Sequence, residues 1–176
     1  MTRKLEKSNV MQRIEIAKVV VNMSIGQGER LEKAVKVLEE ITGQKPCKRK
    51  AKETIREFGI RRGEYMACMV TLRGEKAIEF LRKALMAKGN VIKKSSFDKN
   101  GNISFGIREH LDIPGTKYDP NLGVFGMDVT IVFEKPGYRV SRRKRKRSKV
   151  GRNQRVKIEE SIEYLKNNFG VEVVEE

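Results

Sequence analysis

The residues of this chain best suited to chemistry are cationic and lie close together near its carboxyl end. Between Arg139 and Lys157, eleven of nineteen residues are Lys or Arg and none is Asp or Glu. Like charges at this density repel one another and cannot be buried, so we expect the segment to stay open and solvated until phosphates neutralise it. Its centre is the uninterrupted run Arg142, Arg143, Lys144, Arg145, Lys146 and Arg147. The segment predicts binding of a polyanion, and nucleic acid is the first candidate.

A second cationic segment runs from Gln44 to Arg62, where eight basic residues accompany only Glu53 and Glu57. The formal net charge of the chain is +16, and most of it comes from the segment between Arg139 and Lys157. The charge is therefore local, and Glu159 to Glu176 is acidic overall. Two basic patches separated by ordinary sequence are typical of a protein that touches nucleic acid in more than one place.

Within the second segment, the stretch from Lys48 to Arg62 favours a protruding loop that can touch a nucleic-acid backbone. A merely solvated connection would also be rich in charge, but Gly59 and Gly63 interrupt this stretch and apolar residues lie among the basic ones. An aromatic side chain here could stack on an exposed base. The candidate contact residues of the loop are Lys50, Lys52, Arg56, Phe58, Arg61 and Arg62.

Carboxylates and the only histidine gather in one segment that could suit a metal-dependent hydrolase of RNA. Glu109, His110 and Asp112 stand close together, with Asp119 a few residues later, and such groups can activate a metal-bound water. The same segment contains the Asp-Pro and Pro-Gly pairs of a turn-rich loop, and no second carboxylate cluster has helical ligand spacing. A structural loop is favoured, and we predict no catalytic residues.

Two further motifs are weak evidence for a cofactor or a metal. Gly26 and Gly28 between a strand and a helix resemble the start of a dinucleotide-binding turn, but Leu31 stands where the third glycine belongs. Cys47 and Cys68, with the single histidine, cannot complete a standard zinc site, and a disulfide is not expected in a cytosolic chain. We therefore predict neither a cofactor nor a metal.

The sequence also indicates the cellular compartment of the protein. No apolar stretch approaches the roughly 18 residues of a membrane-spanning helix, and no lipidation motif accompanies the basic run. The segment Met1 to Asn9 lacks the apolar centre of a signal peptide. A polybasic contact with a membrane would tolerate the charge, but these features favour a cytoplasmic protein without a membrane partner.

Alternating and helical spacings predict four strands and three helices. Each helix has a single apolar stripe, so we expect an α+β fold in which helices pack on one face of a largely antiparallel sheet, with a basic C-terminal extension. The expected domain is 1–138, and 139–176 adds the basic segment and a terminal helix packed on the same domain. The strands are centred on Val19 to Ile25, Met66 to Leu72, Ile103 to Ile107 and Met127 to Phe133, and the helices on Leu31 to Ile41, Ala77 to Leu85 and Ile158 to Phe169.

Neutral polar residues occupy the strand faces opposite the apolar ones. Asn22, Ser24 and Thr71 alternate with buried positions, so they should look outward from the side of the sheet that has no helices. Hydrogen-bonding side chains on an open sheet suit contacts to RNA sugars, phosphates and base edges, although ordinary solvent-facing residues would look the same.

Three long segments of the chain resemble one known family. They are SNVMQRIEIAKVVVNMSIGQG from Ser8, GQKPCKRKAK with FGIRRGEYMACMVTLRG between Gly43 and Gly74, and SFGIREHLDIPGTKYDPNLGVFGMDVTIVFEKPGYRVSRRKRKRSKVGRNQRV from Ser104. These segments resemble the L-five (L5) family of large-subunit ribosomal proteins, called L-eleven in the eukaryotic naming. The basic tail and terminal helix resemble the archaeal and eukaryotic branch.

The resemblance implies a protein that binds 5S ribosomal RNA, helps attach it in the central protuberance, and lies beside other large-subunit RNA and proteins. It implies that the loop from Lys50 to Gly63 reaches the transfer RNA in the peptidyl site. RNA-facing positions in the family's NMS, GQKP and VTLRG motifs match Asn22, Gln44 and Thr71, and Gln12 and Arg13 lie in a matching VMQ segment. A regulatory binder of its own messenger would need the same surface, so that alternative stays open.

Overall fold

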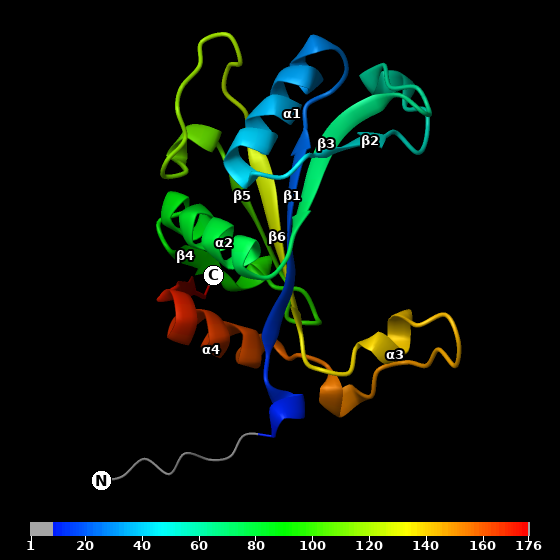
Figure 1. Ribbon diagram of the computed structural model, residues 1–176, viewed down its shortest axis with the longest axis vertical. Helices are drawn as coiled ribbons and strands as arrows, with labels where there is room; N and C mark the ends of the chain where they lie inside the picture. Colours follow the sequence, from blue (N-terminus) through cyan, green and yellow to red (C-terminus); the bar gives the residue numbers. More distant parts are fainter. Residues whose placement is uncertain (1–8, 176) are drawn as a thin grey trace.

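The computed structural model describes residues 9–175, and a five-stranded antiparallel sheet lies at its centre (Figure 1). The strand order is β2-β3-β1-β6-β5, so the first strand of the chain is the middle strand of the sheet. Val21 of β1 pairs with Val70 on one side and with Val129 on the other. The strands are β1 (Glu15–Ser24), β2 (Cys47–Lys50), β3 (Tyr65–Leu72), β5 (Ile103–Ile107) and β6 (Met127–Glu134). The segment Met1 to Ser8, where a signal peptide was considered, lies outside the described residues.

Three helices cover one face of this sheet, and a short fourth helix lies apart from them (Figure 1). α1 (Glu29–Thr42) packs on β3 and α2 (Glu75–Ala87) on β1, while α4 (Ile158–Phe169) lies below α2 in the view of Figure 1. β4 (Val91–Lys93) and β7 (Glu172–Val174) form a small parallel sheet, and α3 (Arg139–Arg142) begins the basic segment. The predicted α+β fold with an antiparallel sheet is confirmed.

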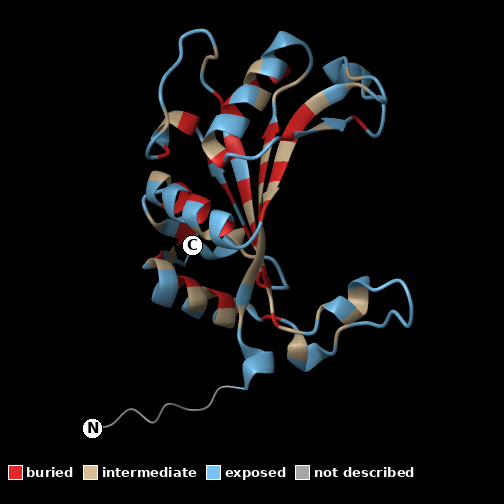
Figure 2. Cartoon of the chain, in the orientation of Figure 1, coloured by how far each residue is buried: buried red, intermediate tan, exposed pale blue. Residues whose placement is uncertain are grey.

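The core follows from the period-two pattern of the strands. Val19, Val21 and Met23 of β1 are fully buried, whereas Val20 and Asn22 between them are only half-buried. Figure 2 shows this alternation along the sheet and a buried stripe on each covering helix. Leu165 of α4 belongs to the same buried cluster as the strand residues. The division of the chain at residue 138 stays a prediction.

The first helix ends where the sequence predicts, but its buried stripe is shifted. Gly43 follows the last turn in the left-handed conformation, at φ 60°, which glycine adopts without steric cost. Helical spacing predicts a buried stripe of Leu31, Ala34, Val35, Leu38 and Ile41, but Val35 and Ile41 are only half-buried, and Val37 and Thr42 are buried instead. Thr42 tolerates burial because its hydroxyl donates to the Leu38 carbonyl oxygen at 2.6 Å.

The expectation of an open and solvated basic run is only partly right. Residues 142–149 are exposed, but the run begins in α3. The side chains of its first two residues, Arg142 and Arg143, also make polar contacts within the protein. Arg142 forms an ion pair with Glu134 of β6, and Arg143 Nε donates to the Lys146 carbonyl oxygen at 2.7 Å. The short strands β2, β4 and β7 were not predicted either, because they have too few alternating apolar residues to give a strand pattern.

α4 is anchored to the sheet by three contacts of different kinds. The ring of Tyr164 packs edge-on against Phe133 of β6, with centroids 5.6 Å apart. Gly101 lies so close to the helix that a Cβ there would be 2.5 Å from Ser161 Oγ. Lys135, whose side chain is only 5% exposed, donates to Glu160 Oε1 at 2.8 Å. The terminal helix is therefore fixed to the end of β6 by packing and by charge.

The Lys135–Glu160 pair predicts a dependence of stability on pH. Partial burial of Glu160 raises its pKa, but hydrogen bonds from Lys135 and the Lys157 backbone N–H outweigh this and lower the pKa overall. Because the folded-state pKa is lowered, the pair stabilises the fold at neutral pH, and this contribution is lost as the pH falls below about 4.5. Glu160→Gln should lower the free energy of unfolding at pH 7 by about 1 kcal/mol, since the buried Lys135 loses its charged partner while solvent screens the 35% exposed Glu160.

The measurement is denaturant unfolding at pH 7 and pH 3. The difference in unfolding free energy between wild type and Glu160→Gln should shrink at the lower pH. Glu163→Gln, on an exposed position of the same helix, is the matched control and should change little at either pH. A Glu160→Gln difference that is the same at both pH values would contradict the assignment of the effect to this pair.

Candidate nucleic-acid interface

The face of the sheet that carries no helices is lined by rows of mostly neutral side chains. One row crosses all five strands, and a second row beside it carries three hydroxyl groups. Ser104 and Thr130 of the second row hydrogen-bond to each other, with their oxygens 2.6 Å apart. The first row is Gly106, Asp128, Asn22, Met69 and Cys47, and the second is Ser104, Thr130, Val20 and Thr71. We call this surface the open face.

The fold brings together the three residues expected to contact RNA. Asn22 and Thr71 lie on the open face in neighbouring strands. Gln44 lies in the turn between α1 and β2, and its Nε2 donates to the Thr71 carbonyl oxygen at 3.3 Å. Asn22 Nδ2 donates to Ser24 Oγ at 3.3 Å, so the hydrogen bonds of both amide side chains to other described residues are long. Their remaining donors and acceptors are available to a ligand.

A basic hollow adjoins Asn22 on the β2 side of the open face. Lys48, Arg49, Lys50 and Lys52 line this hollow together with Asn22, Ser24 and Tyr65. Lys50 Nζ lies 5.0 Å from the centre of the Tyr65 ring, and Lys48 forms an ion pair with Glu32 of α1. Lys50 and Lys52 were expected in the protruding loop, but they line the same hollow as Asn22.

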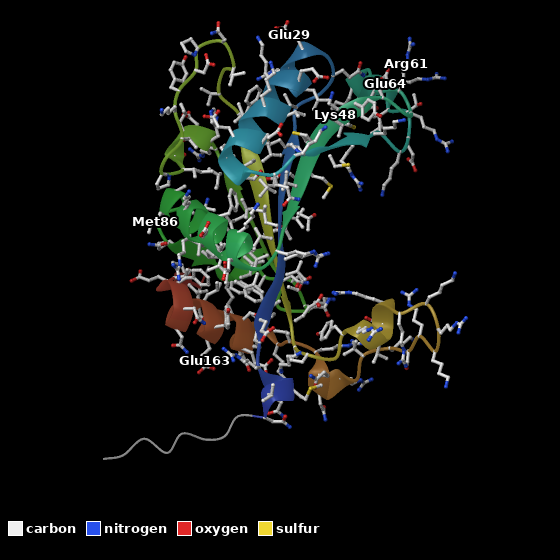
Figure 3. The ribbon with its side chains drawn as sticks, in the orientation of Figure 1. Glu29, Lys48, Arg61, Glu64, Met86 and Glu163 are labelled. Carbon is white, nitrogen blue, oxygen red and sulfur yellow. The ribbon has the colours of Figure 1, made fainter. Side chains whose placement is uncertain are left out.

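The tip of the loop after β2 is structured and projects away from the sheet. Ile55 and Ile60 form an isolated β-bridge around a 3-10 turn at Arg56–Phe58. The Arg62 backbone N–H donates to Thr54 Oγ1 at 3.0 Å, and the Arg61 N–H donates to Glu64 Oε2 at 2.8 Å. Phe58 is 74% exposed, and Arg61 lies at the outer edge of the molecule (Figure 3). We call residues 53–62 the tip loop.

The basic C-terminal segment bounds the opposite end of the same side of the molecule. Figure 1 shows the tip loop and the segment after α3 projecting in the same direction from opposite ends, with the sheet between them. Arg73, Arg139 and Arg142 line a hollow there, together with Glu15 and Glu134. Arg143, Lys144, Arg145, Lys146 and Arg147 extend beyond this hollow and are exposed.

Gln12 and Arg13 do not lie beside Asn22. They end the short 3-10 turn Val10–Gln12 that precedes β1, whereas Asn22 is near the other end of that strand. Nine residues of extended chain place Arg13 and Asn22 about 30 Å apart. Gln154 Nε2 donates to the carbonyl oxygens of Met11 and Pro136, which connects this N-terminal turn to the basic segment.

A third hollow, at the end of the sheet beside the open face, was missed by the sequence reasoning. It lies where β1 and β5 end and β6 begins, and its cationic lining comes from Arg30 of α1, Lys88 after α2, and Arg108 after β5. Asp128 lies in the same hollow, directly between Asn22 and Gly106 in the sheet. Alternation along β6 places Asp128 on the face opposite the core, but only the pairing of distant strands brings it beside Asn22.

The residues considered for hydrolysis do not form a site. His110 is 4% exposed, and its Nδ1 accepts a hydrogen bond from the Phe125 backbone N–H at 3.2 Å. Glu109 and Asp112 are exposed on either side of it. Among residues 9–175, no group of three or more His, Cys, Asp and Glu side chains could hold a metal ion. The structure thus uses His110 to close the loop between β5 and β6.

The two cysteines lie on opposite sides of the sheet. Cys68 is buried in the core, and burial raises the pKa of its thiol, which disfavours the reactive thiolate. Cys47 is exposed on the edge strand β2, and both thiols are free. No helix in the described part of the chain is long and apolar enough to cross a membrane.

Comparison with known families accounts for almost the whole chain. The family model described as ribosomal L5P family C-terminus matches residues 65–163, and the one described as Ribosomal protein L5 matches residues 9–61. The chain belongs to the ribosomal protein L5 family. This confirms the resemblance noted in the sequence, and because the family consists of structural ribosomal proteins, the chain is not an enzyme.

Several L5-family relatives are similar over nearly their full length, and each is called large ribosomal subunit protein uL5. The chain is 57% identical to the protein of Aeropyrum pernix over 170 residues, covering 96% of this chain and 88% of the relative. It is 54% identical to that of Sulfurisphaera tokodaii, covering 95% and 96%. It is 51% identical to that of Methanosphaera stadtmanae, covering 94% and 99%.

Proposed function

We propose that this chain is a structural constituent of the large ribosomal subunit in the cytoplasm, where it binds 5S ribosomal RNA and helps attach it in the central protuberance. The uL5 relatives, which are large-subunit proteins, support the place in the subunit. One observation carries the proposal for RNA. Asn22 and Thr71 lie on the helix-free face of the sheet, Gln44 donates to the Thr71 carbonyl oxygen from the turn at its edge, and Asn22 lines a hollow with four cationic side chains.

The arrangement suits RNA because it separates two kinds of contact. Amide and hydroxyl groups in the middle of the open face can reach sugars and base edges, while cationic groups at its two ends can neutralise phosphates. The run Arg142 to Arg147 contacts large-subunit RNA near the 5S RNA in this proposal. Other large-subunit proteins are neighbours of the chain on the surfaces that RNA leaves uncovered.

We further propose that the tip loop contacts transfer RNA in the peptidyl site. Arg56, Phe58, Arg61 and Arg62 are exposed at the tip, away from Asn22, so they can reach a second RNA while the open face holds the first. Lys50 and Lys52 are assigned to the 5S contact instead, because they line the hollow beside Asn22.

The decisive experiment measures binding of the purified chain to 5S ribosomal RNA and to an unrelated structured RNA at two salt concentrations. We expect tighter binding to 5S RNA that persists at the higher salt concentration. Asn22→Ala should weaken 5S binding by about tenfold, the effect of roughly 1.4 kcal/mol of lost hydrogen bonding, with an unchanged salt dependence. Asn167→Ala, on the exposed side of α4, is the matched control. Equal affinity for both RNAs would contradict the proposal.

A further inference from the structure

The open face carries one carboxylate whose position is unfavourable for a phosphate-binding surface. Asp128 is exposed and pairs in register with Asn22 on one side and with Gly106 on the other. Its side chain makes no hydrogen bond or ion pair within the part of the chain that the structure describes. Next to a polyanion such a charge is repulsive, unless the RNA presents hydrogen-bond donors to it.

Phosphates carry no donors, but the edges of bases do. The Watson–Crick edge of guanine presents two adjacent N–H donors, from N1 and from the N2 amino group, and a carboxylate can accept both at once. Adenine and uracil each place an acceptor at the corresponding edge, and cytosine offers only its N4 amino group. A free carboxylate on an RNA-binding face is therefore selective for guanine.

The surroundings of Asp128 leave room for a base. Its neighbour in β5 is Gly106, which has no side chain to cover the carboxylate, and a Cβ built there would be 3.6 Å from Asp128 Oδ1. Arg30, Lys88 and Arg108 line the same hollow and can neutralise the phosphates of a nucleotide whose base enters it. The carboxylate, the uncovered position at Gly106 and three cationic side chains therefore line one hollow.

We propose that Asp128 is a specificity-determining residue that reads an unpaired guanine of the bound RNA through its N1 and N2 donors. This inference rests on the proposed function, because it assigns a role within the same RNA contact. It adds a base-specific interaction to a surface whose other polar residues, Asn22 and Thr71, can accept or donate to any nucleotide.

The test is the substitution Asp128→Asn, for which simple repulsion and guanine recognition predict opposite changes in affinity. If Asp128 is merely a negative charge near RNA, Asp128→Asn should tighten binding to every RNA, because repulsion is removed. If it reads guanine, the same change should weaken 5S binding by about tenfold while unrelated RNA binds as tightly as before or tighter. Asp112→Asn, an exposed carboxylate that does not line the hollow, is the matched control and should leave both affinities unchanged.

The guanine is located by incorporating inosine phosphorothioate sparsely into 5S RNA, because inosine lacks the N2 amino group. We expect at least one position where inosine interferes with binding by wild type but no longer interferes with binding by Asp128→Asn. Gly106→Val, which suits a strand but covers the carboxylate, should abolish the same interference.

Two results would overturn the inference. One is an Asp128→Asn variant that binds 5S RNA as tightly as wild type or tighter, and the other is an inosine pattern that is identical for both proteins. If the wild-type chain itself fails to prefer 5S RNA, the proposed function is wrong, and this outcome is distinct from both.

Discussion

Replacement of Arg143, Lys144, Arg145, Lys146 and Arg147 by Gln should flatten the salt dependence of RNA binding more than any other change in this chain. Each phosphate contact contributes about 0.9 to the slope of log affinity against log salt on a duplex, so loss of five should reduce the magnitude of the slope by about 4.5. At low salt the affinity should fall by about a hundredfold or more, because these side chains are exposed and form no ion pair among residues 9–175. The measurement is a binding titration at several salt concentrations.

Arg142 provides an internal comparison for this experiment. It belongs to the same run, but it forms an ion pair with Glu134, so part of its charge is already compensated. Arg142→Gln should therefore change the slope by less than one fifth of the five-residue effect. Asn22→Ala should weaken 5S binding with no change in slope. If Asn22→Ala and the five-residue variant changed slope and affinity in the same way, the division between polar and electrostatic contacts would be wrong.

The combined replacement of Phe58, Arg61 and Arg62 by Ala should weaken binding of transfer RNA to assembled large subunits by about a hundredfold. Stacking of a base on an exposed aromatic ring contributes roughly 1–3 kcal/mol, and two phosphate contacts add to it. Affinity for free 5S RNA should stay within about twofold of wild type, because the tip loop projects away from the open face. Filter binding of transfer RNA to reconstituted subunits provides the measurement.

The reciprocal variant replaces Lys50 and Lys52, which lie in the same stretch of sequence but line the hollow beside Asn22. Their replacement by Ala should weaken 5S binding and leave transfer RNA binding to assembled subunits unchanged. A tip-loop variant that binds transfer RNA normally would refute the assignment of the tip. Equal effects of both variants on 5S RNA would show that the loop and the hollow form one site.

The regular elements of the fold could be predicted because their apolar residues repeat at a fixed spacing. Val19, Val21 and Met23 recur at every second position, and this spacing alone places Asn22 on the face away from the core. β2 has no such pattern, since three of its four residues are Lys or Arg, and it forms only because β3 offers an edge to pair with. The spacing of apolar residues therefore predicts a strand or helix only where one side of it is buried in the core.

The candidate site shows a similar limit. The sequence could predict that Asn22 and Thr71 face outward, and only the resemblance suggested 5S RNA as the proposed partner. It could not predict that Asp128 lies beside Asn22, because that depends on the register between strands far apart in the chain. Nor could charge density predict that Arg142 would pair with Glu134, a contact that requires α3 to follow β6 closely in space.

The position of β1 in the middle of the sheet has a consequence for synthesis of the chain. β1 is made first, but its two neighbours are β3 and β6, and β6 is made only after most of the chain. Such long-range pairing forms late, because the intervening chain must be available before the strands can meet. Until Met127–Glu134 has emerged during translation, Asn22 has no Asp128 beside it and half of the open face does not exist. An unfinished chain therefore lacks the complete open face, and under the proposed function capture of 5S RNA through that face follows the completion of β6.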